Sequence, residues 1–218
     1  MLMPGRWLSA EEEARIRQRV SEIEQETGSE IVPYVVGISD PYPEAPWRGF
    51  VLFSVLGLFV LSLITLGQSW AIGPTITEVI LVSLLSGLLG AFLGRYVPPL
   101  RRWLVGRALL DRRVHQRALQ AFLEEEVFAT PNRTGVLIFI SLFERRLEVL
   151  PDKTLAQQVP TEAWRSIVLD VVEGIRRRKP AEGLLRAMED CRQVVLRYAS
   201  NLPEGGDALS DEVRIRPE

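Results

Sequence analysis

Two long segments that lack charges in their interiors constrain the fold of this chain more than any other feature. Gly49–Gly67 holds about 19 residues without a charge, the length that crosses roughly 30 Å of hydrocarbon. A second apolar run, Ile76–Val97, follows closely, and its charges, Glu78 and Arg95, stand near its two ends. Charges at those positions reach the membrane interface and avoid the cost of a charge at the midplane. We therefore expect two transmembrane helices rather than two buried helices of a soluble protein.

The short connection between the two segments predicts an antiparallel hairpin. Thr75 and Glu78 have the spacing of a capping box, which would satisfy the first amides of the second helix. That helix carries small residues at four-residue steps, Ser86, Gly90 and Gly94, and such a stripe lets another helix approach closely. Two alternatives stay open: the stripe packs within the hairpin, or it packs against another membrane protein or a second copy of this chain.

The distribution of basic residues predicts the orientation of the hairpin. The connecting loop has no lysine or arginine, whereas arginines flank the outer ends of both helices: Arg48, Arg95, Arg101, Arg102, Arg107, Arg112 and Arg113. The positive-inside rule then places both termini and the globular part in the cytoplasm. The basic run either only sets this topology or also contacts anionic lipid headgroups.

Composition excludes several kinds of site. The formal net charge is -2, and no segment forms a broad basic face with interleaved aromatic residues, so we expect no nucleic-acid partner. One cysteine and one histidine allow neither an intrachain disulfide nor a Cys/His metal cluster. His115 lies in the polar run RRVHQR and is expected at a helix surface, whereas Cys191 falls on an apolar helix stripe and is expected in the core.

The remaining segments predict a small α/β domain. A helix begins with the capping box of Ser9 and Glu12 and ends at Gly28, and further helices are expected over 100–126, after Pro160 and after Pro180. The helix after Pro160 has a clear apolar stripe: Trp164, Ile167, Val168, Val171, Val172 and Ile175. Apolar, β-branched runs predict three strands: Ile31–Ile38, Val136–Leu142 and Leu147–Leu150.

The order of these elements predicts that the membrane hairpin is an insertion after the first strand. The two later strands form a hairpin, and two strands alone are marginal, so the first strand must pair beside Val136–Leu142. The expected organisation is a split α/β domain with four parts: its N-terminal part (1–46), the transmembrane hairpin (47–98), its main part (99–202) and a polar tail (203–218).

Carboxylates are the candidate site residues. Glu144 and Asp152 stand at opposite ends of the hairpin of the two later strands, and Asp207 and Asp211 lie in the tail. Hard cations such as calcium take several oxygen ligands of this kind. The competing interpretation is that these are solvated loop charges.

The stretch TPNRTGVLIFISLFERRLEVLPD resembles the TPM domain family, also called the thylakoid acid phosphatase domain, and most of all its bacterial membrane-bound branch. The Thr27–Ile31 turn, Trp164 and the Glu182–Gly183–Leu184 helix start are also similar to that branch. Within the stretch the likeness is carried by Thr130, Arg133, Thr134, Gly135, Val136, Leu137, Ile138, Glu144, Arg145 and Asp152.

The resemblance implies a Rossmann-like α/β/α sandwich that the inserted hairpin anchors in the bacterial inner membrane. Some members are linked to phosphatase activity and calcium, and others are accessory proteins of membrane complexes. The branch often reads N-E-L-P-D where this chain has Asp207–Asp211, so the glutamate of that pattern is missing from the loop. We therefore expect an accessory, assembly or scaffold factor without catalytic residues. The alternative is an acid phosphatase-like hydrolase that binds Ca²⁺ through Glu144 and Asp152.

Overall fold

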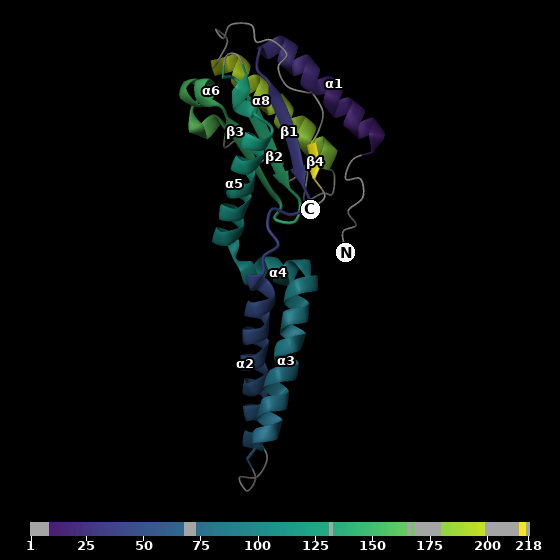
Figure 1. The fold of residues 1–218 in the computed structure, drawn as a ribbon, viewed down its shortest axis with the longest axis vertical. Coiled ribbons are helices and arrows are strands. Elements are labelled where there is room, and N and C mark those ends of the chain that lie inside the picture. Colours follow the sequence, from purple (N-terminus) through teal and green to yellow (C-terminus); the bar gives the residue numbers. More distant parts are fainter. Residues whose placement is uncertain are drawn as a thin grey trace. The chain divides into compact units, whose positions relative to one another are not determined.

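The computed structural model describes residues 9–67, 73–130, 133–164, 167, 180–198 and 214–216. The elements in chain order are α1 (Ala10–Thr27), β1 (Ile31–Val36), α2 (Glu44–Gly67), α3 (Ile76–Tyr96), α4 (Pro98–Val105), α5 (Arg107–Glu124), the 3-10 helix η1 (Val127–Ala129), β2 (Val136–Ser141), β3 (Arg146–Pro151), α6 (Lys153–Gln158), α8 (Pro180–Tyr198) and β4 (Arg214–Arg216) (Figure 1). They form two compact units: Pro41–Leu110, and a mixed α/β unit built from the described residues on either side of it.

The α/β unit is centred on a four-stranded sheet of order β3-β2-β1-β4. β1 runs parallel to β2, with Ile31 opposite Val136, which confirms the pairing expected from the sequence. β2 and β3 form the expected antiparallel hairpin. Because β1 and β2 are parallel neighbours, the chain leaves the sheet after β1, builds α2 to α5, and returns to the same sheet.

A short strand lies where the sequence predicts only a polar tail. Arg214–Arg216 form β4, which pairs parallel to β1 with Tyr34 opposite Arg214, so the tail prediction is wrong for these three residues. The rest of 203–218 lies outside the described residues. Three residues are too few for an alternating pattern to stand out in sequence, and their strand conformation depends on the edge that β1 offers.

Helices pack on both faces of the sheet, so β1 and β2 are buried along their whole lengths. Parallel strands covered on both faces read as continuous apolar runs, which is what both segments are. On one face the core includes Ile16, Val20 and Ile23 of α1 and Leu184, Met188 and Cys191 of α8. On the other face α5 contributes Val114, Ala118 and Ala121, which pack with Tyr34 and Phe139.

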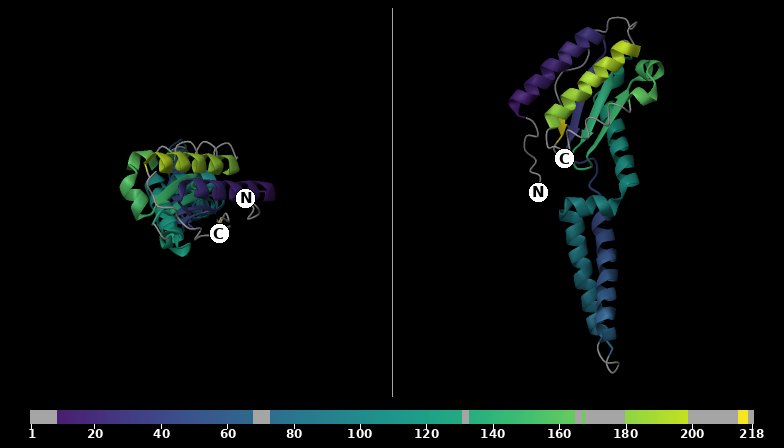
Figure 2. Two further views of the ribbon diagram at one scale, coloured as in Figure 1. Left: turned by 90° about the horizontal axis from the view of Figure 1, so that it is seen from above. Right: turned by 180° about the vertical axis from the view of Figure 1, so that it is seen from behind.

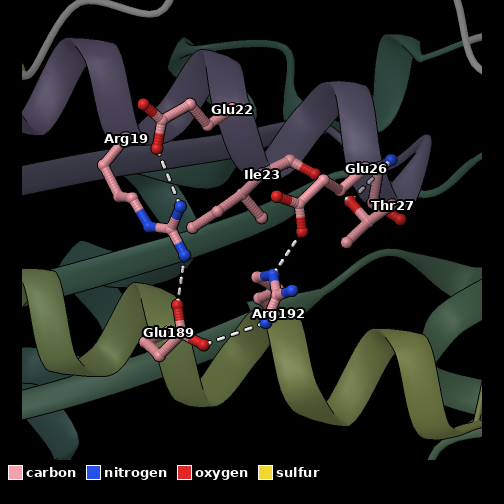
Figure 3. A network of polar contacts seen from close by, with 8 residues as sticks. Arg19, Glu22, Ile23, Glu26, Thr27, Glu189 and Arg192 are labelled. Carbon is pink, nitrogen blue, oxygen red and sulfur yellow. Dashed lines mark hydrogen bonds and ion pairs between the residues drawn. The ribbon is translucent and has the colours of Figure 1, made fainter.

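Ion pairs join α1 to α8, which run side by side (Figure 2). Figure 3 shows that Arg19 of α1 bonds to Glu189 of α8, while Arg192 of α8 bonds both to Glu189 and to Glu26 of α1. The Arg19 hydrogen bond holds the pKa of Glu189 below its usual range. The Arg19 and Glu189 side chains are 29% and 36% exposed, so their pair contributes under about 1 kcal/mol to stability.

Glycine breaks the helix that the sequence predicts over 100–126. The structure has two helices there, α4 and α5, separated by Gly106. Gly106 has a φ of 82°, and its amide donates to the carbonyl of Arg102 at 3.1 Å, which closes α4. A positive φ favours glycine, so a single helix through this position was the wrong expectation.

The helix expected after Pro160 is described only in part. Residues 161–164 and Ile167 are helical, and Trp164 and Ile167 are buried in the core beside α8. The other four members of its apolar stripe, Val168, Val171, Val172 and Ile175, lie outside the described residues.

Candidate functional site

The stripe of small residues on α3 packs against α2. A Cβ on Gly90 would lie 2.2 Å from the carbonyl oxygen of Gly49, and one on Gly94 would lie 2.8 Å from that of Ala45. Ser86 stands against Gly57 in the same way. Of the two alternatives for this stripe, the structure therefore has the internal one, in which close backbone approach joins the two helices of the hairpin.

The outer faces of the hairpin are apolar and uncovered. Both α2 and α3 are long and apolar enough to cross a membrane, and only 11% of the most apolar 18-residue stretch of each helix is buried within the described structure. Phe59 and Leu85, for example, are 59% and 63% exposed. Core helices of a soluble protein would be buried, so the two helices are candidate membrane spans whose outer side chains suit lipid or a partner helix.

The loop before β2 explains why the Thr130–Gly135 motif has these residue types. The Thr130 hydroxyl accepts a hydrogen bond from the Thr134 amide at 3.0 Å, and Thr134 donates to the Gly28 carbonyl at 3.4 Å. A Cβ on Gly135 would lie 2.1 Å from the carbonyl oxygen of Val127, so only glycine fits. This part of the motif holds the start of β2 against the end of α1.

Asp152 fixes the other side of the same loop. Its carboxylate is 2.9 Å from Nε of Arg133 and accepts from the Lys153 amide at 2.6 Å at the start of α6. Its own amide donates to the Gly135 carbonyl at 2.8 Å. The Asp152 side chain is 5% exposed. Arg133, with a φ of 56°, has a left-handed backbone conformation that is uncommon outside glycine.

Glu144 lies in the turn between β2 and β3 and is also buried, at 3% exposure. One carboxylate oxygen accepts from the Ser39 amide at 3.0 Å and the other from the Ser141 hydroxyl. Ser39 in turn donates its hydroxyl to that of Ser141 at 2.8 Å. A buried carboxylate with two hydroxyls thus stands at the carboxyl ends of the parallel strands β1 and β2, the edge where open α/β sheets bind ligands.

The structure does not bring Glu144 and Asp152 together. Glu144 precedes β3 and Asp152 follows it, so the six residues of β3 separate them by roughly 20 Å. One cation cannot bind both, and the two-ligand calcium site expected from the sequence is wrong for this reason. Within the described part of the chain no group of three or more His, Cys, Asp or Glu side chains is arranged to hold a metal. Asp207 and Asp211 lie outside the described residues.

The remaining residues singled out from the sequence lie in the core, in a turn or on the surface. Trp164 is buried in the core beside α8. Arg145 has a φ of 57° in the β2–β3 turn. His115 is on the surface as expected, with Nδ1 2.8 Å from Glu148. Cys191 is fully buried as expected, and burial raises the pKa of its thiol well above the usual range.

Sequence reasoning missed the partners of Glu144. Ser39 and Ser141 are 102 residues apart in the sequence. Ser39 comes three residues after the end of β1, and Ser141 is the last residue of β2. The rule that parallel strands place their carboxyl ends at one edge would have paired them once β1 and β2 were taken as neighbours.

These observations define the α/β unit as a mixed sheet with helices on both faces, and the other unit as a hairpin of two candidate membrane spans. The fold is similar to the NMR structure of BA42, a protein from the psychrophilic bacterium Bizionia argentinensis, with a TM-score of 0.57, 15% sequence identity and 99% of each chain covered. At that identity the likeness shows the fold alone. No protein-family model and no curated protein matches the chain.

Proposed function

We propose that this chain is a membrane-anchored TPM-domain protein, a Rossmann-like α/β/α sandwich that acts as an accessory, assembly or scaffold factor for a membrane complex. The observation that carries the proposal is the hairpin. Its two candidate membrane spans have uncovered apolar faces, and they are inserted in the sequence between the parallel strands β1 and β2 of the α/β domain. The catalytic alternative is weakened because Glu144 and Asp152 both hold turns of the domain and are far apart.

The family assignment is supported by the positions of the motif residues. Gly135 stands where a Cβ would clash with the backbone, and Thr130 and Asp152 each supply a side-chain oxygen that accepts a backbone amide hydrogen bond. Residues with such constraints recur within a fold family because the backbone requires them.

We further propose that the hairpin crosses the bacterial inner membrane with both ends in the cytoplasm. One domain supplies the strands on both sides of the hairpin, so both of its ends lie on one face of the membrane. The arginines around those ends favour the cytoplasmic face. A cysteine at Gly73 should react with an impermeant reagent in intact cells, and one at Arg102 should not. The opposite labelling would overturn the orientation, and the buried Cys191 gives a low background.

The accessory role is tested by purification of the tagged full chain from its native membranes in mild detergent. We expect one membrane protein, or a second copy of the chain, to co-purify at a fixed ratio. Replacing outward-facing Phe59 and Leu85 by alanine should weaken that association. Alanine at the inward-facing Ser54 keeps the apolar outer surface and should leave the association unchanged. Recovery of an isolated monomer from gentle extraction would contradict the accessory role.

The second candidate function is a metal-dependent phosphatase, favoured by the Glu144, Ser39 and Ser141 cluster at the sheet edge. Under this alternative, Ca²⁺ raises the melting temperature and the protein hydrolyses a generic phosphate ester, and Glu144→Gln abolishes both effects while the partly exposed Glu148→Gln keeps them. The accessory role predicts no hydrolysis by the unaltered chain. Robust hydrolysis that depends on Glu144 would reject the accessory role in favour of the phosphatase.

A further inference from the structure

The end of the hairpin that connects to the rest of the chain carries a third helix. α4 begins at Pro98, one residue after α3, and lies across this end (Figure 1). Leu104 Cδ1 packs against the glycines of both helices, 3.1 and 3.4 Å from the Cβ positions of Gly94 and Gly49. The Arg48 guanidinium of α2 donates to the carbonyls of Leu104 and Val105 at 2.8 and 2.9 Å. α4 is therefore fixed to the end of both candidate spans.

Three large aromatic side chains are exposed at this same end, one from each helix. Trp47 of α2 is 69% exposed, Tyr96 of α3 is 62% exposed and Trp103 of α4 is 67% exposed. Indole and phenol rings combine an apolar body with a polar group, and they concentrate at the level of lipid headgroups. The rings thus mark the height at which the hairpin would leave the hydrocarbon.

The same end is strongly basic. Between Pro41 and Leu110 the chain has two carboxylates, Glu44 and Glu78, and only Glu44 belongs to this end, whereas all five arginines of that range do: Arg48, Arg95, Arg101, Arg102 and Arg107. Arg95 and Arg107 are exposed, and Arg95 lies over the Tyr96 ring at 5.7 Å. Guanidinium groups match the geometry of phosphate oxygens. Positive charge, interfacial rings and adjacent apolar spans together fit the surface of an anionic bilayer.

We propose that this end of the hairpin, with α4 lying in the membrane interface, binds the headgroups of anionic phospholipids through Arg95 and Arg107. The aromatic rings set the depth, and the arginines select the phosphate-rich, negatively charged lipids around the protein. This inference rests on the membrane placement proposed above, and it goes beyond topology because it assigns a lipid-selective surface to named residues.

The test measures which lipids surround the full chain in vesicles. The purified protein is reconstituted in mixtures of phosphatidylcholine and phosphatidylglycerol, with bromine on the acyl chains of either lipid, and quenching of tryptophan fluorescence is recorded. We expect brominated phosphatidylglycerol to quench more than its mole fraction predicts. At low salt each arginine near the headgroups should increase the preference for the anionic lipid by up to about fivefold.

The decisive variant is Arg95→Gln with Arg107→Gln. Its matched control is Arg15→Gln with Arg186→Gln, which changes the same charge at exposed positions of α1 and α8. Loss of selectivity in the first variant but not the second, and loss in the unaltered protein at high salt, would support the proposal. The salt series needs no variant and so does not depend on the folding of a mutant chain.

Two outcomes overturn the proposal, and they are distinguishable. Equal quenching by both brominated lipids would place the hairpin in the bilayer without headgroup selection, which rejects the lipid-binding surface and keeps the membrane placement. No quenching by either lipid would reject the membrane placement, and the lipid-binding surface with it.

Discussion

Replacing Gly135 by alanine tests whether the motif before β2 is set by steric constraint. The added Cβ would lie 2.1 Å from the carbonyl oxygen of Val127, 2.8 Å from Val127 Cγ1 and 3.1 Å from its carbonyl carbon. An ordinary contact needs at least 3.4 Å, so η1 and the start of β2 must separate by about 1 Å. The obstacle is backbone, which cannot rotate away.

Two opposing terms give the magnitude. Overpacking of this kind costs about 1–3 kcal/mol. Gly135 is not among the glycines with positive φ, so alanine also restricts the unfolded chain and returns about 0.4–1 kcal/mol. The net loss is about 1–2 kcal/mol, which lowers the melting temperature of a domain of this size by roughly 3–8 °C.

The assay is alkylation of Cys191 against temperature in mild detergent, because this buried thiol reacts only when the α/β unit opens. Gly73→Ala is the control, since its Cβ meets nothing within 4 Å and should leave the transition unchanged. Gly28→Ala separates strain from clash: its φ of 66° predicts a loss of about 1 kcal/mol from the left-handed backbone alone. An unchanged or raised melting temperature for Gly135→Ala would refute the steric reasoning.

Three further predictions follow from the same contacts. In the folded protein Cys191 should resist alkylation at mildly alkaline pH, because burial raises its thiol pKa, and rapid modification without unfolding would show that α8 is not packed as described. The fold lowers the pKa of Glu189, so its ion pair with Arg19 stabilises the folded protein at neutral pH, and this contribution is lost as the pH falls below the usual carboxyl range. Arg19→Gln should therefore lower the free energy of unfolding, measured by urea titration, by under about 1 kcal/mol at pH 7 and by less at pH 3. Replacing Pro41–Leu110 with a short flexible linker should give a soluble α/β domain that folds cooperatively. The two chain ends to be joined lie close together, because Asp40 and Arg113 form an ion pair of 3.5 Å. A chain that circular dichroism shows to be unfolded would contradict the shared sheet.

Local features of this chain were predictable because the interactions that produce them lie within a few residues. The capping boxes of Ser9 with Glu12 and of Thr75 with Glu78 are both present, and each joins residues three apart. The position of β1 beside β2 was also predictable, since a two-stranded hairpin alone could not bury its apolar faces, whereas the parallel orientation came from the structure.

The candidate site was predictable in residue type but not in arrangement. The sequence singled out Glu144 and Asp152, and both are buried and hydrogen-bonded. It did not identify their partners, Ser39 and Arg133. The Ser39 contact spans 105 residues and follows only once β1 is placed beside β2, and Arg133 has a left-handed backbone conformation. Which carboxylate meets which donor is decided by strand register.

The sequence by itself determined the two long apolar segments, the stripe of small residues on the second of them and the excess of arginine at one end, since hydropathy and side-chain size are properties of the residues themselves. Only the tertiary structure decided that Arg214–Arg216 complete the sheet, and that Ser39 and Arg133 are the partners of the two carboxylates. Each of these depends on what another part of the chain presents to the segment, so the same residues in isolation would not adopt them.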